Sequence, residues 1–293
     1  MGMGKTQFAP IRNLNWTFFR IIKKHILTDV RILQILLMGG LLVVGAGLYD
    51  FSLTLQQVFL TFLFGLSTQW FWIKKYNLPN HSLLSASITC LGLSLLLRSS
   101  VWWAHPAMAI LAISSKFVFK WQGRHIFNPS ALGVMVALVL LPNCWASPGQ
   151  WGSEWMAAVW LVALGLFAVQ RAHRPSISLW FLLFYLSCIM TRNLYFGYEW
   201  SILVHKALNG SLLLFSFFMI SDPKTSPDHY LGQVLQAAFV AILASIFHLY
   251  FFKNNGFIYI LLLSNLFVPM INQILKASKF SWRSPTGGVS EVI

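Results

Sequence analysis

The chain has 293 residues, of which 57% are hydrophobic and only 10% are charged. A water-soluble domain carries roughly a quarter charged residues, so this composition excludes a soluble fold and indicates a surface that faces lipid. The net charge of +14 could suggest a nucleic-acid partner, but the basic residues are spread along the chain instead of lying on one soluble segment, which excludes that class.

Residues 1–31 form a basic, amphipathic stretch in which aromatic side chains alternate with Lys and Arg. The stretch precedes the first apolar run and has no cleavable signal pattern. We expect it to lie on the cytoplasmic membrane surface. A solvated basic tail is the alternative interpretation.

Apolar runs of membrane-helix character follow one another from residue 32 to residue 276. Their length and spacing predict an all-α polytopic membrane protein with about ten transmembrane helices. The predicted helices are Ile32–Leu48, Ser52–Ile73, Ser82–Leu97, Val101–Phe119, Ser130–Leu141, Trp155–Val169, Ile177–Met190, Leu208–Ser221, Leu231–Phe252 and Phe257–Ile274.

The basic residues are distributed unequally between the turns. Most of the 21 Lys and Arg residues lie in the N-terminal segment, on alternate turns or near the C-terminal tail (277–293), whereas the opposite turns carry only Arg98, Arg192 and Lys253. Cytoplasmic loops of membrane proteins carry an excess of Lys and Arg. We therefore expect both termini to be cytoplasmic and the protein to lie in the cell (inner) membrane.

An eight-residue pattern occurs twice, at the starts of the third and eighth predicted helices. Asn80-His-Ser-Leu-Leu-Ser-Ala-Ser87 and Asn209-Gly-Ser-Leu-Leu-Leu-Phe-Ser216 share five of eight residues. Helices three and eight hold the same place in two halves of five helices, and an odd number of helices per half inverts the second half. The sequence thus predicts two inverted repeats, at about 32–147 and 154–276, within one transmembrane domain.

Both matching helices are short and follow polar or turn-forming residues. Short segments at equivalent positions of inverted halves are typical of a binding site near the membrane midplane. We predict such a site at the repeat interface, formed by Asn80, Ser82, Asn209 and Ser211. Two helices that are merely short or tilted are the alternative.

Three polar motifs interrupt the apolar pattern. In Gly123-Arg-His-Ile-Phe-Asn-Pro-Ser-Ala-Leu-Gly133, Asn128 and Pro129 are typical of a helix start, and Arg124 and His125 beside it would suit an anion or phosphate. The segment Ser221-Asp-Pro-Lys-Thr-Ser-Pro-Asp228 ends the eighth helix and could be either a plain turn or a cradle for a polar ligand. In the last helix, Pro269 should kink the backbone, and Asn265 needs a partner.

Other polar residues have simpler explanations. Glu199, His205 and Lys206 are explained about equally well by an interfacial cluster and by a functional one. His105-Pro106 is typical of a helix kink. The three cysteines lack metal-ligand spacing, and the scattered acids form no catalytic constellation, so we predict no catalytic residue and no metal site.

The motifs GRHIFNPSALG, FFMISDPKTSP and NLFVPMIN, in this order and at these helix ends, resemble the NqrB/RnfD family. Members of this family are membrane subunits of the Na+-translocating NADH:quinone reductase and of the Rnf electron-transport complex. The resemblance spans roughly residues 30–276. It implies ten helices in two inverted five-helix repeats, similar to urea transporters. It also implies a flavin on a transmembrane electron path coupled to ion movement, and partner redox subunits.

The chain departs from this family in one respect. Family members carry FMN on a threonine of a Ser-Gly-Ala-Thr type motif in a long connection between the fifth and sixth helices, but that string is absent here and the connection shrinks to about Asn143–Glu154. The absence of the motif argues against covalent FMN. In lacking it, the chain resembles the short branch of the family labelled UnbU. A flavin held non-covalently, as FMN or riboflavin, is the corresponding expectation. Arg124, His125 and Asn128 would hold its ribityl or phosphate group, and Asp222, Thr225 and Ser226 would bond ligand or ion.

The leading functional hypothesis is therefore a membrane subunit of an electron-transport system that works with other membrane or extracytoplasmic redox subunits. Catalysis by this chain alone is not expected. The alternative is a permease of inverted-repeat fold that conducts a small solute or an ion without redox chemistry. A membrane anchor for a secreted partner is a third possibility, although the short outer loops offer little docking area.

Overall fold

The computed structural model describes residues 29–48, 52–146, 155–171, 173–252, 255–278, 282–283 and 289–290. Residues 1–28 of the predicted amphipathic segment and most of the predicted tail lie outside these ranges. Each of the ten apolar runs contains a helix, so the prediction of an all-α architecture is confirmed. The helices are α2 (Val30–Leu48), α3 (Leu55–Tyr76), α4 (Leu83–Leu96), α5 (Ala104–Val118), α6 (Pro129–Leu140), α7 (Trp155–Arg171), α8 (Pro175–Phe196), α9 (Trp200–Ala207), α10 (Gly210–Leu214), α11 (Tyr230–Leu249) and α12 (Gly256–Ile274).

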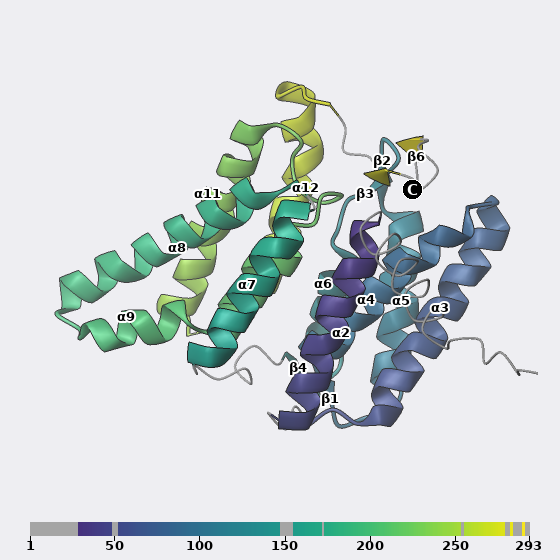
Figure 1. Cartoon of the computed structure of the whole chain (residues 1–293), viewed down its shortest axis with the longest axis horizontal. Helices are drawn as coiled ribbons and strands as arrows, with labels where there is room; N and C mark the ends of the chain where they lie inside the picture. Colours follow the sequence, from purple (N-terminus) through teal and green to yellow (C-terminus); the bar gives the residue numbers. More distant parts are fainter. Residues whose placement is uncertain are drawn as a thin grey trace, which may run out of the picture.

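Short elements connect these helices. The 3-10 turn η1 (Asn80–Ser82) precedes α4, and the π-helical turn η2 (Phe215–Met219) continues α10. The strand β1 (Leu97–Ser99) pairs with β4 (Cys144–Ala146), and β2 (Lys120–Trp121) pairs with β3 (Arg124–His125). A third antiparallel pair joins β5 (Trp282–Arg283) to β6 (Val289–Ser290). Figure 1 places β1 and β4 at one end of the helices and the β2–β3 hairpin at the other, which we call the hairpin end.

Local sequence signals explain where several helices begin and end. Thr54 and Gln57 form a capping box at the start of α3, and Asn77 ends that helix in the left-handed conformation. Asn128 caps α6 through a bond from the Ala131 N–H, with Pro129 at the first helical position, as predicted. These caps fix where the two helices begin and where α3 ends.

The two halves of the chain use the same helix pairings. In the first half α3 packs against α5, α5 against α6, and α2 against α4. In the second half α8 packs against α11, α11 against α12, and α7 against α10 and η2. The first group lies on one side of Figure 1 and the second on the other. The inverted relation between the halves stays a prediction.

Helices α3 and α8 show the same burial pattern. Each has 22 residues and buries every fourth position, which makes one narrow stripe along a helix. The stripe consists of Gln57, Thr61, Gly65, Gln69 and Ile73 on α3, and of Ile177, Phe181, Tyr185, Ile189 and Asn193 on α8, where Ser178 is buried as well. Large apolar side chains on the other faces, such as Phe71 and Leu183, are more than half exposed. Faces of this kind are suited to lipid contact.

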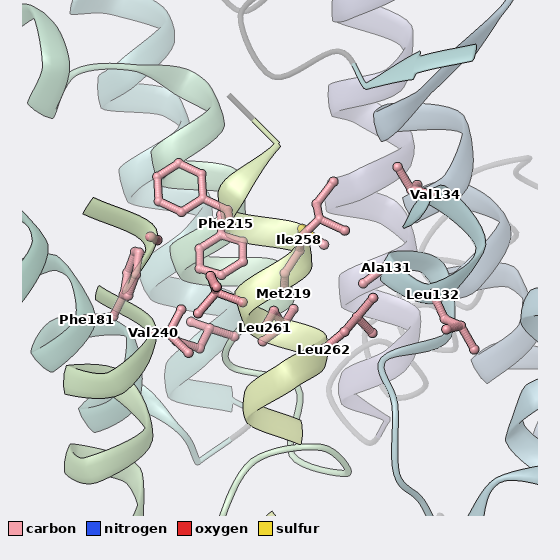
Figure 2. Packing of buried hydrophobic residues seen from close by; sticks show 14 of the residues in the cluster. Ala131, Leu132, Val134, Phe181, Phe215, Met219, Val240, Ile258, Leu261 and Leu262 are labelled. Carbon is pink, nitrogen blue, oxygen red and sulfur yellow. The ribbon is translucent and has the colours of Figure 1, made fainter. Parts of the chain in front are cut away.

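The two halves meet in a continuous apolar core between α6 and α12. Figure 2 shows Ala131 of α6 and Ile258 and Leu262 of α12 within this cluster, which continues to Phe215 and Met219 of η2. These residues are at most 6% exposed. The core therefore holds η2 against the interface of the two halves.

Three described helices, α8, α11 and α12, are both long and apolar enough to cross a membrane. The pair formed by α9 and the segment Gly210–Met219 passes the same test as one span, with a bend of 44° at the break. The chain is thus a multi-pass membrane protein, as predicted. The remaining apolar helices are shorter or less apolar, and the number of ten spans stays a prediction.

Candidate functional site

The three polar motifs of the sequence come together at the hairpin end. The hairpin itself depends on Gln122 and Gly123, whose φ angles are 48° and 82°. Two consecutive positive φ values are typical of the tight turn that joins two antiparallel strands. The turn brings Arg124 opposite Trp121 and His125 opposite Lys120, directly before the start of α6.

An ion cluster links the first motif to the second. Arg124 Nη1 lies 2.9 Å from Asp228 Oδ2, and Arg174 Nη2 lies 2.8 Å from Asp228 Oδ1. Arg174 also donates to the Pro227 carbonyl at 3.0 Å, and the Asp228 N–H donates to Asn272 Oδ1 at 2.9 Å. Since Asp228 is 5% exposed, one buried carboxylate compensates two arginines and ties the hairpin to the loop and to α12.

Asn128 connects all three motifs. Besides capping α6, its amide donates to Asp222 Oδ2 at 3.4 Å. With the Asn265 amide oriented so that both its atoms are paired, Asn265 accepts from the Asn128 backbone N–H at 3.1 Å and donates to the Thr225 carbonyl at 3.3 Å. The expectation that Asn265 needs a partner is therefore confirmed.

A cavity of about 110 Å³ lies between α4 and η2, closed by α2, α5 and the start of α6. This volume is several times the space that one ordered water requires. Its lining includes apolar and aromatic side chains, among them Met38, Phe117, Phe217 and Phe218, and the charged residues Arg31, Lys116, His125, Asp222 and Lys224. The sequence predicted a ligand site between the helices that became α4 and α10 with η2. That this cavity binds a ligand stays a prediction.

Several polar groups in the cavity wall can make further hydrogen bonds. Gln69 Oε1 and His125 Nε2 are buried and accept or donate no hydrogen bond among the described residues. The ammonium of Lys116, which is 7% exposed, donates to the Ser85 carbonyl at 3.1 Å and to Ser85 Oγ at 3.3 Å. Buried polar groups are normally paired, so such groups in a cavity indicate a polar ligand or ordered water.

Electrostatics keep the loop groups of this wall in defined states. Burial works to raise the pKa of Asp222, but His125, the Lys224 N–H and the Lys224 ammonium together hold it below the ordinary value. Burial lowers the pKa of His125, and Asp222 opposes this shift from 3.9 Å. Burial, with Arg124 and Arg31 nearby, lowers the pKa of Lys224 to about 8. The Asp222 carboxylate is therefore ionised at neutral pH, and it lies beside Lys224, whose pKa of about 8 is close to neutral pH.

The structure places the predicted cofactor residues unevenly. His125, Asn128 and Asp222 line the cavity, whereas Arg124 lines a second pocket at the hairpin end. Thr225 and Ser226 are buried in the loop and line neither pocket.

Of the predicted repeat-interface residues, only Ser82 reaches the cavity. Asn80 is exposed and does not line the cavity. Asn209 instead caps α10 through bonds from the Ser211 and Leu212 N–H groups. Ser211 is partly buried but does not line the cavity. The Asn209 side chain is used by the helix itself, because it satisfies free N–H groups in the first turn of α10.

Sequence reasoning missed Lys116, Gln69 and the two phenylalanines of η2. The signal for Lys116 was its position within the apolar run Val101–Phe119, because a charged residue inside such a run often has a functional role. No group of three metal-binding side chains occurs among the described residues.

Comparison with protein-family models finds a similarity in the second half of the chain. Residues 144–281 match the model of the NQR2, RnfD, RnfE family. The match includes the loop 221–228 and the Asn265–Asn272 motif, and it begins after the hairpin motif. No curated protein matches the chain.

Proposed function

We propose that the chain is a membrane subunit of an electron-transport complex of the Rnf/Nqr type, because residues 144–281 match the NQR2, RnfD, RnfE family model. The multi-pass helical architecture supports this role. The proposal includes separate redox subunits that deliver electrons to this chain and remove them from it.

The cavity between α4 and η2 is the proposed position of a non-covalently bound flavin. The observation that supports it is the combination of an aromatic wall, Phe217 and Phe218, with buried polar atoms of Gln69 and His125 that lack partners among the described residues. An isoalloxazine ring binds against apolar faces with a few hydrogen bonds at its edge. The cavity of about 110 Å³ is smaller than the roughly 300–1,000 Å³ of ordinary ligand sites, so flavin binding requires the phenylalanine side chains of η2 to move outward. A bound flavin would supply one-electron and two-electron transfer.

The side chains of the cavity have distinct tasks in this proposal. Gln69 Oε1 accepts from a ring N–H, and the Lys116 ammonium donates to a ring carbonyl while Ser85 holds it in place. His125 and Asp222 lie at the loop side of the cavity, where a ribityl hydroxyl or a proton would be held. The apolar residues of α2 and η2 exclude bulk water, which strengthens these polar contacts.

The finer architecture is part of the same proposal. The repeated pairings of α3 with α5 and α8 with α11, and the matched burial stripes of α3 and α8, support two repeats of five helices. The basic residues of the hairpin end support its placement at the cytoplasmic face. Coupling of electron transfer to ion movement remains an expectation from the family.

The test is to purify the chain together with its redox partners and record its absorption spectrum. The expected result is a yellow protein whose flavin is released on denaturation, because it is not covalently attached. A colourless protein without extractable flavin would contradict the flavin assignment. Flux of a small solute or ion into proteoliposomes that contain this chain alone would instead favour a permease.

A further inference from the structure

Two helices of the first half carry a group of stacked aromatic rings at the hairpin end. The rings of Trp72 and Tyr76, at the end of α3, are nearly parallel, and their centroids are 5.5 Å apart. Phe117, near the end of α5, is almost parallel to both, with its centroid 4.9 Å from that of Trp72 and 6.1 Å from that of Tyr76. The Trp72 indole N–H also donates to Ser114 Oγ at 3.3 Å. The packing of α3 on α5 (Figure 1) therefore fixes these three rings, which we call the aromatic platform.

Two lysine ammonium groups lie against the aromatic platform. Lys75 Nζ is 4.9 Å from the centroid of the Trp72 ring and 5.9 Å from that of Tyr76. Lys120 Nζ, on β2, is 4.9 Å from the Phe117 centroid and 5.5 Å from that of Tyr76. A cation this close to an aromatic ring is attracted to the ring, so the platform orients both side chains. Because both ammonium groups lie beside Tyr76, an anion next to that ring is within reach of both.

The charge of these lysines is not compensated by a carboxylate. No ion pair among the described residues includes Lys75 or Lys120, and Asp228 at the same end of the molecule pairs with arginines instead. Lys74, whose Nζ lies 4.9 Å from the centroid of the Trp70 ring, adds a third cation nearby. Lys75 is exposed and Lys120 is partly exposed, so an anion can approach both. Cations that are oriented by rings but have no carboxylate partner favour an anion from outside the chain.

The surface that leads to the platform along α3 is apolar. Phe59, Leu63 and Phe71 are exposed on this helix, and a face of this kind is suited to contact with acyl chains. Lysine side chains near the end of a membrane helix extend to the level of the headgroups, and tryptophan and tyrosine rings are enriched at the same level. An apolar helix face that ends in uncompensated cations matches a phospholipid better than a soluble anion or an acidic protein.

We propose that the aromatic platform, together with Lys75 and Lys120, binds the headgroup of an anionic phospholipid from the membrane leaflet at the hairpin end. The phosphate lies beside Tyr76, where both ammonium groups reach it, and the acyl chains lie along the apolar face of α3. Both lysines act as charged donors, which form stronger hydrogen bonds to phosphate than neutral donors do. Neither the family match nor the proposed flavin site assigns a ligand to these lysines.

The experiment uses the full chain in detergent, stripped of lipid. Native mass spectrometry measures the binding of phosphatidylglycerol and of phosphatidylcholine with equal acyl chains, and glycerol 3-phosphate serves as a competitor that has the charge without the chains. The test variants are Lys75→Gln, Lys120→Gln and the double variant, and Lys75→Arg/Lys120→Arg retains both charges. The matched control is Lys276→Gln, an exposed lysine beyond the end of α12 that contacts no ring among the described residues.

We expect phosphatidylglycerol to bind more tightly than phosphatidylcholine. Each Lys→Gln variant of the platform should weaken the binding of phosphatidylglycerol about fivefold, and the double variant should weaken it further, because each lysine near the membrane surface adds to the attraction for anionic lipid. The double Arg variant and Lys276→Gln should bind like the wild type.

Equal binding of the two lipids would overturn the proposal. An equal loss in Lys276→Gln would overturn it as well, since it indicates attraction to the whole basic surface. Displacement of phosphatidylglycerol by an equimolar amount of glycerol 3-phosphate would identify a soluble phosphate as the ligand instead. Loss of co-purified proteins in the Lys75→Gln/Lys120→Gln variant, with lipid binding unchanged, would assign the lysines to a protein interface. None of these readouts depends on flavin, so this proposal and the flavin assignment fail separately.

Discussion

Arg124 on the β2–β3 hairpin and Asp228 on the loop before α11 form an ion pair of 2.9 Å across 104 positions of sequence. Asp228 also holds Arg174, at the residue before α8, at 2.8 Å. All three side chains are at most 14% exposed. The hairpin of the first half and two segments of the second half are thus fixed to one another by a single carboxylate.

Replacement of that carboxylate should be strongly destabilising. In Asp228→Asn, Arg124 and Arg174 lose their shared counter-charge while both remain largely buried, and removing one partner from a buried pair costs roughly 3–5 kcal/mol. Thermal unfolding of the purified protein in detergent should show a clear fall in the midpoint. Glu199→Gln is the control, because Glu199 is exposed and makes no cap bond to α9. Equal midpoints for Asp228→Asn and the wild type would show that the cluster does not hold the hairpin.

The shape of the interior cavity depends on Gly165 of α7. A Cβ added there would lie 2.5 Å from the ring of Phe217, which is closer than real Cβ atoms approach a neighbour. Gly165→Ala should therefore displace Phe217 of η2, and we expect a loss of bound flavin per protein of several-fold, measured by release on denaturation. Gly40→Ala on α2 is the matched control. A Cβ at Gly40 meets nothing within 4 Å, and the substitution should be neutral or stabilise the helix by about 1 kcal/mol. Unchanged flavin content in Gly165→Ala would argue against Phe217 as part of the site.

The sequence predicted the helices and their caps, because each of these features depends on a few neighbouring residues. The apolar runs indicated the helices, and the Asn128-Pro129 pair indicated the start of α6, which its cap bond confirms. The three polar motifs were recognisable individually, but their meeting point depends on how α6 packs against α12. The eight-residue match shared by Asn80 and Asn209 could not show that the two segments differ locally, with a 3-10 turn before α4 and an Asn209 cap on α10. The position of Lys116 in an apolar run was visible in the sequence, but its contact with Ser85 depends on how α5 packs against α4.

Lys116 provides a direct test of the flavin assignment. Its ammonium lines the cavity and donates to the carbonyl and the hydroxyl of Ser85, so Lys116→Gln removes a charged donor without enlarging the side chain. A hydrogen bond to a charged group contributes roughly 1.5–3 kcal/mol, which corresponds to a loss of affinity of about 10- to 100-fold. Equilibrium dialysis of the apoprotein against FMN and riboflavin would measure it. Lys75→Gln, at the exposed end of α3, should bind like the wild type. If both variants retain wild-type affinity, the flavin does not occupy this cavity.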